Sequence, residues 1–195
     1  GFQTPDSGVV KVRVEVLDDN ETETRESVIV TATTDSNHVN AQSASAQGII
    51  KDDLVEREDG SKVDADAPDL EISGGDKARE GEETYLNYEV SLSGEAFGEV
   101  NTFLDITGTA SDADLGAVQI KLPNGEWQDY DEVNGFQTPD SGVVKVRVEV
   151  LDDNETETRE SVIVTATTDS NHVNAQSASA QGIIKDDLVE REDGS

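Results

Sequence analysis

Residues Val144 to Val150 read Val-Lys-Val-Arg-Val-Glu-Val, and this stretch decides the fold class. Its valines alternate with charged residues, so in an extended chain all the valines fall on one face and all the charges on the other. A period of two with a β-branched residue at each apolar position is typical of a half-buried strand. The stretch therefore predicts a β-strand that has one face in a core.

The same alternation recurs before and after this strand. The alternating segments are residues 70–72, 86–92, 100–106, 118–122, 162–166 and 178–184. The tripeptide Pro123-Asn124-Gly125 follows one of them and is a turn signal. No segment shows a convincing helical period. About seven short strands separated by turns predict an all-β fold, an antiparallel Greek-key β-sandwich of the immunoglobulin-like type.

The chain contains an internal repeat. Residues 1–61 recur letter for letter as residues 135–195, an offset of 134 positions. This pattern suggests a piece of a longer tandem array that begins in mid-repeat. We predict that residues 1–61 are the C-terminal half of a preceding identical repeat, residues 62–68 an acidic linker, residues 69–188 a complete sandwich and residues 189–195 the start of the next linker.

A half-repeat on its own has an incomplete core. It would leave sheet edges and apolar side chains exposed. We therefore expect residues 1–61 to be partly disordered or to be completed by another chain, for example through strand-swapped self-association.

The composition limits the classes of partner. The chain has 44 acidic and 14 basic residues, a net charge of −30, and no cysteine. This charge excludes a basic nucleic-acid footprint, and it opposes binding to an anionic membrane surface. No apolar run approaches the ~18 residues of a membrane-spanning helix, so we expect no membrane insertion. The absence of cysteine excludes disulfides and thiolate metal sites.

Carboxylates cluster where the predicted strands end. The clusters are Asp152 to Glu160 after the valine-rich strand, Asp186-Asp187 after the last strand, Glu80 to Glu83, and the loop with Asp112 and Asp114. Two like charges ~4 Å apart repel by several kcal/mol at an effective dielectric of ~20, and a bound dication removes this cost. Calcium accepts ~6–8 oxygen ligands in a flexible geometry, whereas magnesium demands a strict octahedron and zinc prefers Cys and His. The alternative is that these acids form a solvated surface.

The segment from Glu80 to Asp187 resembles the Calx-β domain. The matching features are Arg79-Glu80-Gly81, Gly108-Thr109-Ala110, the pattern Asp152-Asp153 with Glu157 and Glu160, and the closing Ile184 with Asp186-Asp187. The form with Trp127, Phe136 and Pro139 is similar to repeats of giant secreted bacterial adhesins of the RTX type. In those proteins long tandem arrays act as extenders. The resemblance implies an extracellular, cell-surface protein whose partners are neighbouring repeats of the same chain.

The resemblance also implies several Ca²⁺ ions per repeat and a set of ligands. In the complete repeat these ligands are Glu80, Asp114, Asp152, Asp153, the Glu155 carbonyl, Glu157, Glu160, Asp186 and Asp187. Their counterparts in the first copy are Asp18, Asp19, Glu21, Glu23, Glu26, Asp52 and Asp53. The linker adds Asp64, Asp66 and Asp69, and we hypothesise that an ion at this junction locks two domains in line.

Three binding functions stay open, and we expect no enzymatic activity. No serine has a nucleophile elbow, and the single histidine of each copy lies in a polar turn. The favoured function is a calcium-stiffened extender, because identical copies in tandem suit a spacer. The first alternative is a calcium-sensing regulatory Calx-β module. The second is an acidic mimic of nucleic acid, which predicts protein partners and indifference to chelators.

Overall fold

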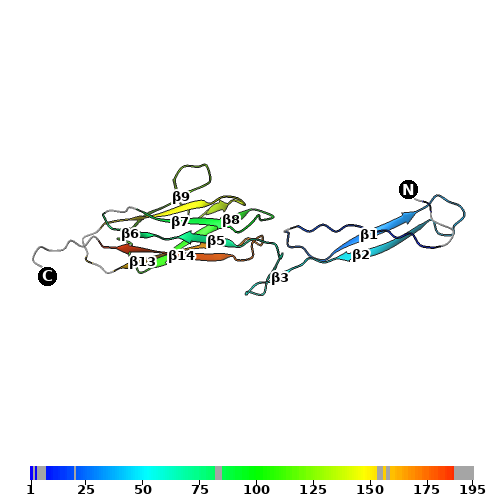
Figure 1. Ribbon diagram of the computed structural model, residues 1–195, viewed down its shortest axis with the longest axis horizontal. Coiled ribbons are helices and arrows are strands. Elements are labelled where there is room, and N and C mark those ends of the chain that lie inside the picture. The colour runs from blue at the N-terminus through cyan, green and yellow to red at the C-terminus, as the bar shows by residue number, and fades with distance from the viewer. Residues whose placement is uncertain are drawn as a thin grey trace, which may run out of the picture. The chain divides into compact units, whose positions relative to one another are not determined.

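The computed structural model describes residues 1, 3, 8–19, 21–81, 85–152, 156 and 159–186. These residues form fourteen strands and no helix (Figure 1), which confirms the all-β prediction. The chain divides into two compact units, Gly1–Asp19 with Glu23–Asp52, and Asn20–Thr22 with Asp53–Ser195. None of the described residues belongs to a helix long and apolar enough to cross a membrane.

The second unit contains two five-stranded sheets. The first has the order β10 (Gln128–Asp129), β9 (Leu115–Lys121), β12 (Val144–Val150), β7 (Tyr85–Leu92) and β5 (Leu70–Gly74), with antiparallel neighbours throughout. The second has the order β11 (Phe136–Thr138), β8 (Val100–Gly108), β13 (Glu160–Thr167), β14 (Ser177–Lys185) and β6 (Lys77–Arg79). Only the β14–β6 pair of this sheet is parallel.

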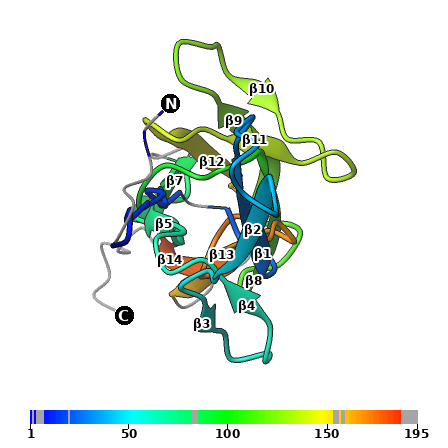
Figure 2. The ribbon, with the colours of Figure 1, turned by 90° about the vertical axis from the view of Figure 1, so that its right-hand side faces the viewer.

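The sheets contain more strands than the alternation predicts. The additional strands β6, β10 and β11 are two or three residues long, too short to show a readable period. β10 lies beside β9 at the outer end of the first sheet (Figure 2). These three short strands end their sheets, so the central strands are the ones that the sequence reveals.

Both sheets contribute side chains to a single core. Val146 and Val148 of β12 and Val162 and Val164 of β13 are all fully buried in one apolar cluster. Fully burying one such side chain stabilises the fold by roughly 1.5–3 kcal/mol. The Tyr88 hydroxyl of β7 donates a hydrogen bond of 3.1 Å to the Val162 carbonyl, which ties one sheet to the other. The valine alternation therefore points into the core as predicted.

The chain passes from one sheet to the other at Gly74-Gly75. β5 pairs with β7 in the first sheet, and β6 begins two residues after Gly75 in the second sheet. Both glycines have positive φ, +101° and +82°, a conformation that side chains other than glycine rarely adopt. A Cβ on Gly75 would also collide with the Gln181 carbonyl of β14. Two glycines in succession therefore permit the strand switch.

The first unit is a hairpin of β1 (Glu26–Thr33) and β2 (Ser43–Ile50). Its register, Glu26 opposite Ile50, matches Glu160 opposite Ile184 in the second copy. Residues 9–19, which repeat the sequence of β12 and its flanks, form no strand. The local hairpin therefore forms in both copies, whereas the valine-rich strand forms only in the second.

The predicted linker and the residues just before it are folded. β3 (Val55–Glu56) pairs with β4 (Lys62–Val63) in a small hairpin (Figure 2). Val63, Ala67 and Pro68 of the predicted linker are buried in the second unit. The predicted linker therefore contains buried apolar residues beside its acids.

Candidate metal centre

Three carboxylates converge at one end of the second unit. Glu80 follows β6, Asp114 precedes β9 and Glu160 opens β13. One carboxylate oxygen from each lies within 4.8 Å of the others. Glu80 and Asp114 are buried, and Glu160 is half-buried. Oxygen ligands at ~2.3–2.6 Å from a common Ca²⁺ lie at most about twice that distance apart, so the spacing fits one coordination sphere.

Backbone pairing fixes the positions of Glu80 and Glu160. The Glu80 N–H donates to the Lys185 carbonyl at 3.0 Å, which extends the parallel pairing of β6 with β14 by one residue. Glu160 lies opposite Ile184 in the β13–β14 register. Both carboxylates are therefore carried by strands that pair with β14.

A tight loop between β8 and β9 holds Asp114. Its Oδ2 accepts the Ser111 N–H at 2.6 Å, and its own N–H donates to the Ser111 carbonyl at 3.2 Å. The Asp114 carbonyl accepts the Leu151 N–H at 2.8 Å. The start of this loop is joined to β13, because the Thr109 and Ala110 N–H groups both donate to the Ser161 carbonyl. The loop therefore delivers Asp114 to the beginning of β13, where Glu160 lies.

Asp114 carries a buried oxygen that these contacts leave unused. Its side chain is 0% exposed, and its Oδ1 has no hydrogen-bond partner among the described residues. A buried carboxylate oxygen without a partner costs free energy unless a cation or a donor compensates it. The two other acids of the cluster place further negative charge beside it. The site therefore has the charge, the burial and the unsatisfied ligand atom that a cation would use.

The other predicted ligands of this repeat lie apart from the cluster or outside the described residues. Asp152 is exposed and Asp186 is half-buried, and neither joins Glu80, Asp114 and Glu160 in the group that shares the 4.8 Å spacing. The structure does not describe Asp153, Glu155, Glu157 and Asp187.

The predicted ligands of the first copy and the linker fall into three classes of exposure. Asp18, Asp19, Glu26, Asp53 and Asp66 are exposed, Glu21, Glu23, Asp52 and Asp69 are half-buried, and Asp64 is fully buried. In the first unit, the Glu23 N–H donates to Asp52 Oδ2 at 2.8 Å.

Asp64 and Asp69 each make a long-range hydrogen bond in the second unit. The N–H of Asp64 donates to Thr22 Oγ1 at 3.0 Å, and its Oδ1 accepts the Asp66 N–H at 2.8 Å. Asp69 Oδ1 accepts the Ala175 N–H at 2.9 Å. Asp69 therefore joins the start of β5 to the loop before β14, a structural role that the sequence does not reveal.

Sequence reasoning missed the residues that orient the cluster. Ser111 holds Asp114 through its backbone, and its hydroxyl accepts the Ala113 N–H at 3.1 Å. A serine three positions before an aspartate in a turn is a signal that could have found this loop, because such side chains bond nearby backbone groups. Thr109 and Ser161 exchange further hydrogen bonds across the same junction, from the Ser161 N–H to Thr109 Oγ1 at 2.8 Å.

A separate polar cluster lies on the outer side of the first sheet. The Arg147 guanidinium lies 4.0 Å from the ring centroid of Tyr85 and 4.2 Å from that of Trp127. Its Nε and Nη2 both donate to Gln119 Oε1, at 2.9 and 2.6 Å. These contacts satisfy the arginine, so the cluster braces β7, β9 and β12.

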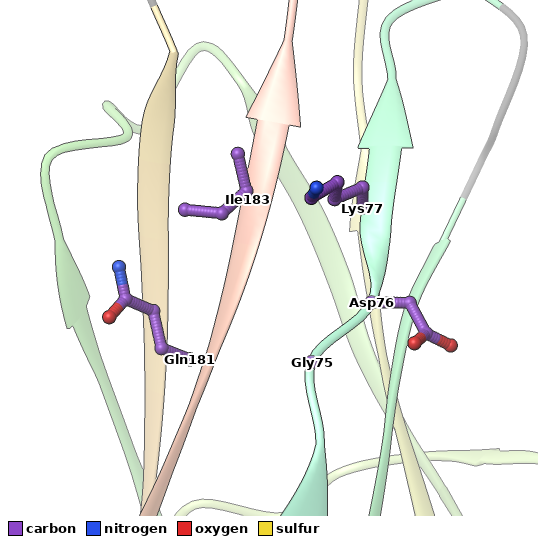
Figure 3. Close-up of a pocket in the computed structure, with 5 residues that line it drawn as sticks. All are labelled: Gly75, Asp76, Lys77, Gln181 and Ile183. Atoms are coloured by element: carbon purple, nitrogen blue, oxygen red, sulfur yellow. The ribbon is translucent and has the colours of Figure 1, made fainter.

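A shallow hollow of about 530 Å³ lies where the chain changes sheets. Gly75, Asp76, Lys77, Gln181 and Ile183 line it. In Figure 3 the side chains of Asp76 and Lys77 extend to opposite sides of the chain. The hollow therefore does not gather its polar groups at one point, in contrast to the carboxylate cluster.

Comparisons with known proteins assign no family to this chain. No family model matches the chain, and no curated protein matches it. Among solved structures, the chain is similar to one described as AvmM, which catalyses macrocyclization in alchivemycin A biosynthesis. The identity is 11%, the TM-score is 0.43, and the match covers 73% of this chain and 99% of that one.

This match overturns the expectation that the chain is not an enzyme, because the matched protein is one. We therefore withdraw that expectation. A likeness at this TM-score carries no argument for a particular activity, and we assign none.

Proposed function

We propose that this chain is a calcium-binding structural extender from a tandem-repeat bacterial surface adhesin. In this proposal the second unit is a Greek-key β-sandwich of the Calx-β type, and Ca²⁺ at its end stiffens the repeat. The protein acts outside the cell, where it holds a distal binding region away from the cell surface.

One observation supports this proposal above the others, the buried cluster of Glu80, Asp114 and Glu160. Its members come from three separate elements of the chain, so folding is required to bring them together. Folding also brings together their charges and leaves Asp114 Oδ1 without a hydrogen bond among the described residues. A cation that binds only the folded state would turn this cost into a stabilising contribution.

The donor set favours calcium over other common metal ions. The three side chains offer only carboxylate oxygens, which are hard ligands. The chain has no cysteine, which removes the thiolates of typical structural zinc sites. Magnesium usually keeps several waters, whereas calcium accepts carboxylates in irregular, largely protein-built sites. Calcium therefore suits a buried cluster formed by strand ends and a loop.

The extender works through thermodynamic linkage. At a free concentration one hundred times Kd, a ligand specific to the folded state adds about 2.7 kcal/mol to the free energy of unfolding. For a chain of this size that gain raises the Tm by roughly 5–10 °C. A repeat loaded with calcium would thus resist local opening better than the metal-free repeat.

Thermal unfolding of the full chain tests the proposal. We expect millimolar Ca²⁺ to raise the Tm of the second unit relative to excess EGTA, and Mg²⁺ at equal ionic strength to raise it less. Asp114→Asn should abolish the calcium-dependent rise, because the amide is a weaker calcium ligand than the carboxylate. In EGTA the same variant should be at least as stable as the wild type, because it removes one of three clustered charges.

Asp112→Asn is the matched control. Asp112 lies in the same loop but is exposed and outside the cluster, so this variant should keep the calcium response. Equal calcium responses in the Asp114→Asn and wild-type chains would refute the assignment of the site.

A calcium-sensing module is the second candidate, and the same cluster supports it. A sensor requires a change of conformation upon binding, whereas an extender requires only greater rigidity. Hydrogen exchange with and without calcium separates the two. Slower exchange without a change in the pattern of strand pairing would support the extender, and new pairing in β6, β8 or β13 would support the sensor.

A further inference from the structure

We propose that the first unit is an acceptor surface for a second copy of the segment 62–134, which would convert its hairpin into a complete two-sheet repeat. The inference does not depend on calcium binding. It rests on a comparison of two identical stretches of sequence that differ in what covers them.

The first observation is the different burial of identical side chains. Val12, Val14 and Val16 are 61%, 56% and 59% exposed. Their counterparts Val146, Val148 and Val150 are at most 5% exposed. Val30 of β1 is 37% exposed, whereas its counterpart Val164 is fully buried. These valines therefore lack the cover that their counterparts have in the second copy.

The second observation is the difference in strand pairing of the same stretches. β12 pairs with β7 on one side and β9 on the other, and β13 pairs with β8 as well as β14. Among the described residues of the first copy, β1 pairs only with β2, and residues 9–19 form no strand. All the missing partners, β7, β8 and β9, belong to residues 62–134. One segment would therefore supply every absent pairing and the absent half of the core.

The occupant must be a copy of residues 62–134 that does not already cover the valine-rich segment of another repeat. A second whole chain has one such segment and already uses it to cover its own residues 144–150. Donating that segment would expose in the donor the same valines that it covers in the acceptor. Because the sequences are identical, such an exchange has no net gain in buried area. The surface therefore fits an additional copy of residues 62–134 rather than an intact second chain.

Thiol accessibility tests the proposal, because the chain has no cysteine of its own. In the variant Val12→Cys the new thiol lies on the acceptor face and should react readily with a disulfide reagent. Adding the separate polypeptide 62–134 should slow this reaction at least about tenfold, because the thiol then reacts only when the completed unit opens. Light scattering should give one added polypeptide per chain rather than two.

Four controls make the outcome specific. Ile29→Cys lies on the opposite face of β1, and its counterpart Ile163 is only half-buried in the second copy, so its reaction should slow far less than that of Val12→Cys. Val146→Cys should react slowly from the start. The double variant Val12→Cys with Val30→Asp should lose the protection, because it places a charge in the new core. A polypeptide of the same composition in scrambled order should not protect Val12→Cys.

Repeating the thiol assay in calcium and in EGTA separates this inference from the proposed function. The added segment carries Glu80 and Asp114, and the first unit carries Glu26, the counterpart of Glu160. Protection that is equal in calcium and in EGTA would support the acceptor surface and count against the calcium site. Protection in calcium alone would support both. An unchanged rate for Val12→Cys in both conditions, or an equal slowing of Ile29→Cys, would overturn the acceptor surface.

Discussion

Two buried polar side chains, Tyr88 and Asp114, differ in how their polar atoms are satisfied. The Tyr88 hydroxyl has a protein acceptor, the Val162 carbonyl of the facing sheet. Asp114 uses one oxygen for Ser111 and leaves the other without a hydrogen bond in the described part of the chain. A satisfied polar group in a core mainly fixes how the sheets align, whereas an unsatisfied one marks a place where a ligand would stabilise the fold. Tyr88 thus joins the two sheets, whereas Asp114 keeps one buried oxygen that a ligand would use.

Tyr88 gives the protein a predictable response to alkaline pH. Burial raises the pKa of the Tyr88 hydroxyl to about 12 from its ordinary 10.0, although a hydrogen bond with the Gly182 backbone opposes this rise. The folded state therefore holds the phenol proton more tightly than the unfolded state. This contribution to the free energy of unfolding is complete below pH ~10 and is lost as the pH rises towards ~12. Denaturant titrations across this range should show the loss.

Tyr88→Phe is the test variant for this prediction. It should lower the free energy of unfolding at neutral pH by about 1 kcal/mol, the net value of a typical hydrogen bond, and weaken the alkaline loss. Some loss should remain, because burial also raises the pKa of Tyr130. An alkaline loss of the same size in Tyr88→Phe and the wild type would show that Tyr88 does not titrate with unfolding.

At the scale of elements, the strand switch at Gly74-Gly75 allows one stretch of chain to serve both sheets. Gly75→Ala should destabilise the second unit by about 2 kcal/mol or more, because it adds both strain at positive φ and a collision with the Gln181 carbonyl. The variant Gly142→Ala separates the cost of backbone strain from the cost of the collision. Gly142 also has positive φ, +90°, but its new Cβ would lie 3.5 Å from Pro123 in ordinary contact. It should cost only about 1 kcal/mol, and urea unfolding of both variants measures the difference.

Alternation predicts the long strands because it is a local property of the sequence. The pattern of residues 144–150 predicts β12 correctly, and the register of β13 with β14 recurs unchanged in β1 with β2. The same valine pattern in residues 10–16 forms no strand, because the segment that would pair with it is absent from the first unit. Local pattern therefore specifies which residues could form a strand, and distant partners decide whether they do.

The candidate site likewise has a part that local sequence reveals and a part that depends on distant contacts. Glu80, Asp114 and Glu160 are all among the ligands that the resemblance to the Calx-β domain implies, and as carboxylates near predicted strand ends they are visible in the sequence. Their grouping without Asp152 was not predictable from spacing, since it depends on the loop that Ser111 and Leu151 fix through backbone hydrogen bonds. The partners of that loop are distant in the chain, because Leu151 lies 37 residues after Asp114 and Ser161 lies 52 residues after Thr109.

Identical substitutions in the two copies should have different effects. Val148→Ala removes two methyl groups from a fully buried position and should cost about 2 kcal/mol of unfolding free energy. Val14→Ala makes the same change at a counterpart that is 56% exposed, and should change the stability by less than about 0.5 kcal/mol. Chemical denaturation followed by Trp127 fluorescence reports on the second unit. Equal losses for the two variants would contradict the different environments of the two copies.

At the scale of the whole molecule, the net charge of −30 makes stability depend on the ionic medium. Self-repulsion among exposed acids acts over about 30 Å at 0.01 M salt and about 3 Å at 1 M. Sodium chloride should therefore raise the Tm progressively, since screening relieves the compact state more than the expanded one. This effect comes from charge spread over the surface, so it should not depend on the buried cluster.

The salt response and the calcium response should be separable. We expect Asp114→Asn to keep the wild-type rise in Tm with sodium chloride while it loses the rise with millimolar calcium. Calorimetry in both salts at matched ionic strength measures the two responses on the same samples. If calcium acted only by screening, its effect would vanish at matched ionic strength in the wild type, and the variant would behave identically. A calcium rise that persists in ~1 M sodium chloride and requires Asp114 would instead locate the ion in the buried site, where solvent ions screen poorly.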